Sequence, residues 1–173
     1  MKAVTVKELK TELSHYSQKE LVELCLRLSK FKKENKELLT YLLFESSNEE
    51  GYISSIKLEI DEQFELVNTK TYYFIKKSVR KILRSVKTAI RYSKKKETEV
   101  ELLLYFCKKL KAFKPSIHKN TVLKNLFDRE IANIEKKMGV LHEDLQYDYG
   151  QELEKLKTAH YPPKGELILK AES

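Results

Sequence analysis

The residues of this 173-residue chain with the clearest capacity for chemistry are the lysines and arginines of its middle segment. The segment 70–96 contains eleven basic residues and no acidic one, which gives it a formal charge of +11. The whole chain carries +8, so the remaining residues sum to −3. Clustered lysines and arginines are the electrostatic signature of proteins that bind phosphate backbones. The sequence therefore indicates a site for an anionic partner within 70–96.

Helical spacing places most of these basic residues on one side of the segment. At about 100° per residue, the apolar residues from Ile75 to Ile90 fall roughly on the opposite side, where they can dock against a core. An aromatic ring on the basic side can stack on a nucleic acid base. The residues predicted to bind a polyanion are Lys77, Arg80, Lys81, Arg84, Lys87, Arg91, Lys95 and Tyr73. The alternative is a solvated lysine-rich face that binds no partner, because a basic face by itself is a signal of low specificity.

No residue is predicted to act in catalysis or to bind a metal ion or cofactor. Phosphate-binding loops need several glycines so that backbone amides can surround the anion, and the four glycines of this chain are scattered. Zinc sites need three or four Cys, His or carboxylate ligands together, whereas the four histidines are dispersed. Glu12 and His15 form one E-x-x-H motif, but the second copy that a di-iron bundle requires is missing. We therefore expect a non-enzymatic protein without a small-molecule substrate.

The sequence also predicts a cytoplasmic protein. The residues from Met1 to Glu8 reach charged side chains before an apolar run of signal-peptide length develops. The longest apolar stretch, 102–107, is far shorter than the roughly 20 residues that span a bilayer. We expect no membrane partner, because the apolar face of the basic segment is needed for the core.

Helices are the elements predicted to position these residues, because Leu, Lys and Glu are abundant and Gly and Pro are few. Apolar stripes recur at helical spacing, and Cys25 and Cys107 fall on them, where both are predicted to be buried. The expected fold is all-α, with five to seven amphipathic helices in an array of hairpins or an irregular bundle. Helix starts are expected at four S/T-x-x-E capping boxes, namely Thr5 with Glu8, Ser17 with Glu20, Ser47 with Glu50, and Thr98 with Glu101.

The C-terminal third carries an apolar pattern with heptad spacing, which predicts one long helix whose apolar face is buried within the monomer. Gly139 and Gly150 weaken this helix, so that a bend or a break is an alternative. Pro162 and Pro163 end it. We expect a single domain over 1–163 followed by a tail over 164–173. The heptad positions are Phe127, Ile131, Ile134, Met138, Leu141 and Leu145.

The opening segment resembles the start of small all-helical bacterial proteins of uncharacterised function. The residues that carry this resemblance are those from Thr5 to Lys10 and from Ser17 to Leu24. The segment is also similar to the SAP module, a two-helix hairpin that binds DNA and has a late Glu-Leu-Val, found here at Glu20 to Val22. This chain has His15-Tyr16-Ser17 where that module has a glycine between its helices. Neither resemblance implies a catalytic residue.

Three functions are compatible with these observations. The first is a non-catalytic binding protein whose basic segment contacts nucleic acid or another polyanion, mainly through phosphates. The second is a protein-interaction scaffold that uses a groove between helices or the heptad face over 127–145. The third is an enzyme whose carboxylates and tyrosines converge only in the folded chain.

Overall fold

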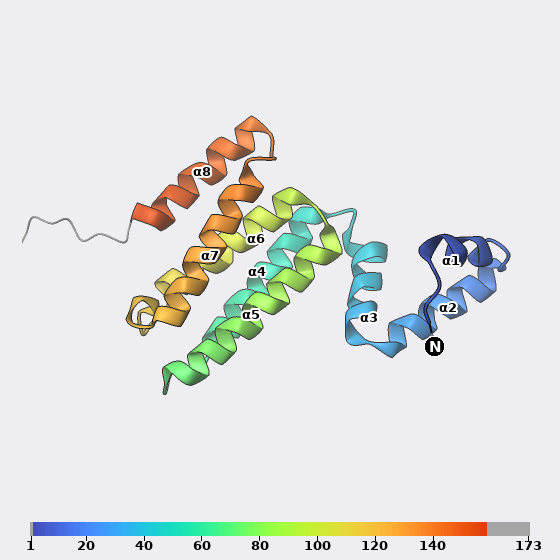
Figure 1. Ribbon diagram of the computed structural model, residues 1–173, viewed down its shortest axis with the longest axis horizontal. Coiled ribbons are helices and arrows are strands. Elements are labelled where there is room, and N and C mark those ends of the chain that lie inside the picture. The colour runs from blue at the N-terminus through green and yellow to red at the C-terminus, as the bar shows by residue number, and fades with distance from the viewer. Residues whose placement is uncertain (1, 159–173) are drawn as a thin grey trace, which may run out of the picture. The chain divides into compact units, whose positions relative to one another are not determined.

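The structure of the chain is a computed structural model that describes residues 2–158, of which 82% are helical and none lies in a β-strand. The predicted all-α fold is therefore confirmed (Figure 1). The predicted tail 164–173 and the last residues of the predicted domain lie outside the described residues. The elements, which include a π-helix (η1) and a 3-10 helix (η2), are α1 (Val6–Leu13), α2 (Gln18–Phe31), α3 (Lys33–Thr40), η1 (Tyr41–Glu45), α4 (Glu49–Glu65), α5 (Tyr72–Ser93), α6 (Lys96–Ala112), η2 (Ile117–Lys119), α7 (Thr121–Met138) and α8 (Glu143–Thr158).

The chain divides into two compact units, Met1–Ser47 and Asn48–Ser173, whereas the sequence predicted a single domain. The division follows from packing. Helices α1 to α3 contain no buried residue, and the shared hydrophobic core is formed by residues from Ile53 onward. Because no proline- or glycine-rich linker precedes Asn48, composition gives no sign of this boundary.

In the first unit, side chains cap the backbone amides at the helix starts. Thr5 N donates to Glu8 Oε2 at 2.7 Å, and Glu8 N donates to Thr5 Oγ1 at 3.3 Å. Ser17 and Glu20 form the same reciprocal pair before α2, at 2.8 and 3.4 Å. Each pair satisfies two amides that have no partner within the helix. Both predicted capping boxes are confirmed.

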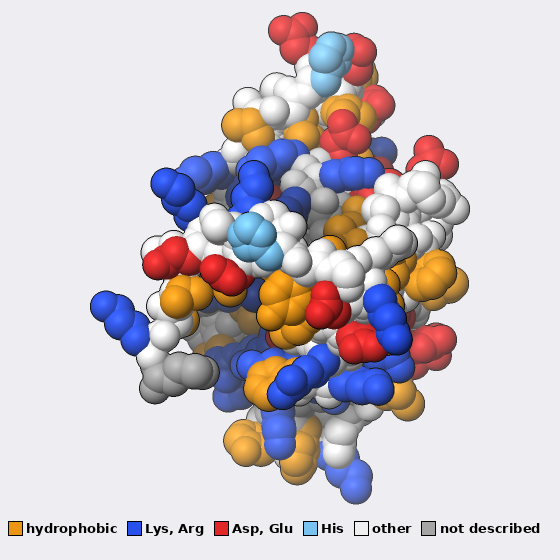
Figure 2. All heavy atoms as spheres, turned by 90° about the vertical axis from the view of Figure 1, so that its right-hand side faces the viewer, with side chains coloured by type: hydrophobic (Ala, Val, Ile, Leu, Met, Phe, Trp, Pro, Cys, Tyr) orange, Lys and Arg blue, Asp and Glu red, His pale blue; other side chains and the backbone are white. Residues whose placement is uncertain are grey.

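Many apolar side chains of the first unit lie at the surface, although Leu21 and Leu24 are half-buried and Tyr41 is buried. Val6, Leu28 and Phe31 are 82%, 60% and 78% exposed. Figure 2 shows hydrophobic side chains, in orange, reaching the surface among charged ones. Cys25 is also exposed, so the prediction that its thiol is buried is wrong. Its stripe has helical spacing, but α2 buries none of its residues.

Helix α6 lies at the centre of the second unit. Its side chains Leu102, Phe106 and Leu110 are fully buried, and the helix contacts α4, α5, α7 and α8. Figure 1 shows these helices running alongside one another. This unit is therefore an irregular bundle in which four helices share one central partner. No helix within residues 2–158 combines the length and apolar character that crossing a membrane requires.

The prediction of one long C-terminal helix is wrong, because α7 ends at Met138 and α8 begins at Glu143. Leu141 N donates to Met138 O at 2.9 Å, so a tight turn after Gly139 replaces the next helical turn. Helix α8 then packs against α6 and α7. The heptad positions before the turn face the core of the monomer, as predicted, and the buried ones are Phe127, Ile131, Ile134 and Met138.

Candidate functional site

Helix α5 presents the predicted basic residues on the side opposite its apolar face. The buried side chains of α5 are Ile75, Val79, Ile82, Leu83, Val86, Ala89 and Ile90, and they pack into the core of the second unit. This burial fixes the rotation of the helix about its axis. Six of the seven predicted lysines and arginines are exposed, and Lys87 is half-buried. The helix can therefore offer its cations to a partner without leaving the core.

The basic side of α5 forms one wall of an open groove whose other wall is α7. Tyr72 Oη donates to Ser116 O at 2.9 Å, and Lys87 Nζ donates to Glu130 Oε1 at 2.9 Å. From the first contact to the second, the residue number rises by a similar amount in both segments. Helices α5 and α7 therefore run in the same direction. The groove has a volume of about 850 Å³ and is lined by Arg80, Leu83, Arg84, Lys87, Thr88, Arg91, Val122, Asn125, Leu126 and Arg129.

Five cationic side chains converge on this groove. Arg80, Arg84, Lys87 and Arg91 come from α5, and Arg129 comes from α7. None of the described residues that line the groove is acidic. Arginine presents a planar set of donors that matches two phosphate oxygens at once. Four arginines on two facing walls therefore form a site suited to phosphate groups.

Arg129 was not among the predicted residues. Its neighbours in the sequence are Asp128 and Glu130, so a local count of charge gives no signal there. In the structure, Asp128 pairs with Lys124 at 2.6 Å, and Glu130 points into the core. The helical positions of Val122, of Asn125 and of Arg129 share one face, and that face meets the groove.

Glu130 is a buried carboxylate beneath the groove, with 1% of its surface exposed. Lys87 Nζ donates to its Oε1 at 2.9 Å and lies 2.8 Å from its Oε2. Arg129 Nε donates to Oε1 at 3.3 Å. A buried carboxylate is tolerated only when cations or donors compensate it. Lys87 and Arg129 therefore both compensate a carboxylate inside the protein, although the Arg129 side chain stays 68% exposed.

Cys107 lies behind this ion pair in the core, as predicted. Burial raises the pKa of its thiol far above the usual value, and the negative charge of Glu130 raises it further. The thiol therefore stays protonated at neutral pH, which makes it a packing group and not a nucleophile.

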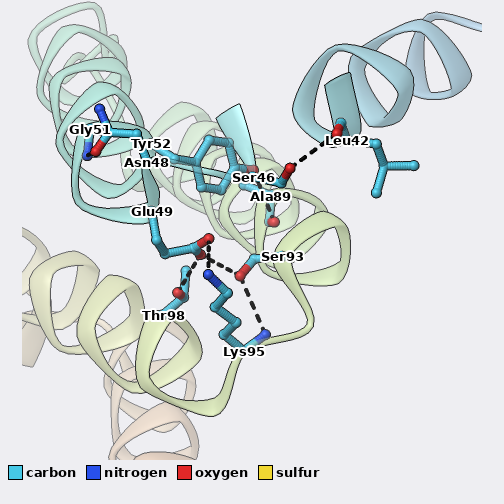
Figure 3. A network of polar contacts seen from close by, with 10 residues as sticks. All are labelled: Leu42, Ser46, Asn48, Glu49, Gly51, Tyr52, Ala89, Ser93, Lys95 and Thr98. Atoms are coloured by element: carbon cyan, nitrogen blue, oxygen red, sulfur yellow. Dashed lines mark hydrogen bonds and ion pairs between the residues drawn. The ribbon is translucent and has the colours of Figure 1, made fainter. Parts of the chain in front are cut away.

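Lys95 is also compensated by an acidic residue outside the basic segment. Its Nζ lies 2.9 Å from Glu49 Oε2 at the start of α4. Thr98 Oγ1 donates to Glu49 Oε1 at 2.6 Å, and Ser93 Oγ donates to the same oxygen. Figure 3 shows the Glu49 carboxylate between these three side chains. This network joins α4 to the α5–α6 connection, so Lys95 has a structural partner and does not line the groove.

The remaining predicted residues lie on α5 outside the groove. Lys77 and Lys81 are exposed. Tyr73 is 66% exposed, and its ring meets Phe74 edge-on, with centroids 5.4 Å apart and planes at 76°. Phe74 therefore limits the orientations of the Tyr73 ring while leaving its surface accessible.

Carboxylates and tyrosines also converge elsewhere, between α4 and α6. Tyr105 Oη donates to Asp61 at 2.8 Å, and Lys109 Nζ lies 2.9 Å from the same carboxylate. Burial raises the pKa of Asp61, but the hydrogen bonds from Lys109 and Tyr105 outweigh it and hold that pKa below its usual value. Burial and the Asp61 charge raise the pKa of Tyr105. Both groups thus keep their ordinary charge states at neutral pH.

A neighbouring pair completes this cluster. Lys57 Nζ donates to Glu101 Oε1 at 2.6 Å, and Tyr149 Oη donates to Glu101 Oε2 at 3.3 Å. Burial and the Glu101 charge raise the pKa of Tyr149 to about 12. The contacts link α4, α6 and α8, which accounts for the cluster as a structural network. Within residues 2–158, no group of three His, Cys, Asp or Glu side chains is placed to hold a metal ion.

No protein-family model, curated protein or solved structure matches the chain. The candidate site therefore rests on the α5–α7 groove itself.

Proposed function

We propose that this chain is a non-catalytic binding protein that engages nucleic acid through the α5–α7 groove. The observation that carries the proposal is the convergence of Arg80, Arg84, Arg91 and Arg129 on one open hollow without an acidic lining residue among those described. Phosphate contacts of this kind supply affinity and position but little sequence information. We therefore expect binding that depends weakly on sequence and strongly on salt.

The scaffold alternative has less support. The heptad face over 127–145 is one of its two candidate surfaces, and four of the six heptad residues are buried in the monomer. Its other candidate is a groove between helices, and the α5–α7 groove is basic. A protein partner at that groove would have to be acidic, which makes it an outcome of the binding experiment below.

The experiment measures binding of labelled single-stranded DNA, double-stranded DNA and inorganic polyphosphate at low salt. The test variant carries Arg80→Glu, Arg84→Glu and Arg91→Glu. We expect it to lose more than about tenfold in affinity for every polyanion that the wild-type protein binds. For the wild-type protein, four arginine–phosphate contacts predict a slope of about −3 in a plot of log affinity against log salt for a single strand.

A matched control separates the groove from net charge. Lys2, Lys7 and Lys19 are exposed residues of the first unit, and their joint reversal to glutamate lowers the formal charge from +8 to +2, as the groove variant does. We expect the control variant to keep most of its affinity. Equal losses in both variants would assign binding to net charge alone. Absence of binding to every probe at low salt would refute the proposed function.

A further inference from the structure

We infer that the α5–α7 groove selects single-stranded nucleic acid, whose phosphates follow the arginines while one base stacks on Tyr73. This inference rests on the proposed function and specifies its ligand. It depends on three features of the second unit, which are the shape of the groove, the position of an exposed ring and the apolar floor.

The shape of the groove favours a single strand over a duplex. A helix that contacts duplex DNA usually enters the major groove, which is about 12 Å wide, and must therefore protrude from the protein surface. The arginines of α5 that line the groove instead face a hollow whose other wall is α7. The phosphates of a single strand in this hollow can be contacted by Arg84 from one wall and by Arg129 from the other.

An exposed aromatic ring continues the line of cations along α5. Tyr73 precedes Arg80 by seven residues, which is about two helical turns and about 10 Å along the axis, so both lie on the same face. Lys77 lies between them on that face and is exposed. Proteins that bind single strands combine a basic groove with an aromatic platform for the bases. Tyr73 and the arginines provide both parts on one helix face.

The floor of the groove indicates a ligand with apolar surfaces. Leu83 and Leu126 are buried side chains that line it, and Val122 is 40% exposed beside them. An inorganic polyphosphate has no apolar group to place against these residues, whereas a nucleotide strand has sugars and base faces. The lining therefore favours a nucleotide strand over a bare chain of phosphates.

The test compares three probes on the intact chain: a mixed-sequence single strand of about 12 nucleotides, the corresponding duplex, and inorganic polyphosphate with a similar number of phosphates. We expect the single strand to bind most tightly. Tyr73→Ala should weaken single-strand binding by about 5-fold to 140-fold, the range expected for the stacking of one base. Tyr73→Phe should preserve binding because it keeps the ring, and polyphosphate binding should be unchanged in both variants.

Tyr147 provides a matched control, because it is 68% exposed and lies on α8, away from the groove lining. Tyr147→Ala should leave all three affinities unchanged, and circular dichroism should show equal helicity in every variant. Tighter duplex binding, or unchanged single-strand binding in Tyr73→Ala, would overturn the inference while leaving the proposed function intact. Failure of all three probes to bind would remove the proposed function as well.

Discussion

The two units of this chain are both helical, but different interactions stabilise their helices. In Met1–Ser47, hydrogen-bonded caps at Thr5 and Ser17 fix the helix starts, but α1 to α3 bury no side chain. In Asn48–Ser173, a continuous core forms around α6. Isolated short helices are marginal in water, and most helical stability in proteins comes from packing of an apolar face. We therefore expect a stable second unit and a first unit that depends on local interactions.

The largest expected effect concerns the core. Phe106 is fully buried, and its ring lies 5.8 Å from that of Phe64. Phe106→Ala should lower the free energy of unfolding by about 3–5 kcal/mol. Leu13 in α1 is 43% exposed, and Leu13→Ala should cost about 0.5 kcal/mol or less. Urea titrations followed by circular dichroism can measure both. Similar losses for the two variants would show that the α1 stripe is covered in solution and that the first unit is also stabilised by a buried core.

A smaller effect concerns the caps. Ser17→Ala removes the hydroxyl that accepts from Glu20 N, and loss of an N-cap typically costs about 1 kcal/mol. Amide exchange in α2 should therefore accelerate about fivefold, while exchange in α6 stays unchanged because no cap of the second unit is altered. Ser17→Asp should restore protection, since aspartate is an equally good N-cap. Acceleration in both helices would mean that the two units unfold together.

The same contrast explains how far the sequence could predict the fold. The capping boxes at Thr5 and Ser17 involve residues three apart and form as expected. At the start of α4 the cap is Asn48, not Ser47, and Thr98 lies inside α6, where it donates to Glu49. The predicted helix starts at Ser47 and Thr98 are wrong because a neighbouring cap residue or a tertiary contact determines which side chain caps the helix.

The candidate site, like the fold, could be predicted from the sequence only in part. The basic side of α5 was predictable from spacing, because the apolar stripe determines which residues are exposed. The acidic partners of Lys87 and Lys95 were not, since Glu130 and Glu49 are more than forty residues away in the sequence. Arg129 joins the groove only through the packing of α7. Charge composition thus located one wall of the site, and helix packing determined its shape and which of its cations have acidic partners.

The smallest expected effect is a difference in acid sensitivity between the units. Hydrogen bonds from the side chains and backbone amides of Thr5 and Ser17 lower the pKa values of Glu8 and Glu20 below the ordinary 4.5. A carboxyl whose pKa is lower in the folded state stabilises that state above its unfolded pKa, and the contribution is lost as the pH falls through the folded pKa. The caps of the first unit should therefore weaken progressively as the pH falls below about 4.5, and they should be lost below the folded pKa values of Glu8 and Glu20.

The second unit has a corresponding group in Asp61, whose pKa is also lowered, but its helices also share a buried apolar core whose side chains carry no charge. On acidification, amide exchange corrected for its intrinsic pH dependence should increase in α1 and α2 before it increases in α6. Glu8→Gln and Glu20→Gln together should remove this pH dependence from the first unit, because glutamine can accept the same hydrogen bonds without titrating. If α1 and α2 keep equal protection at pH 3 and pH 7, the carboxylate caps do not hold these helices, and interactions that do not titrate stabilise the first unit.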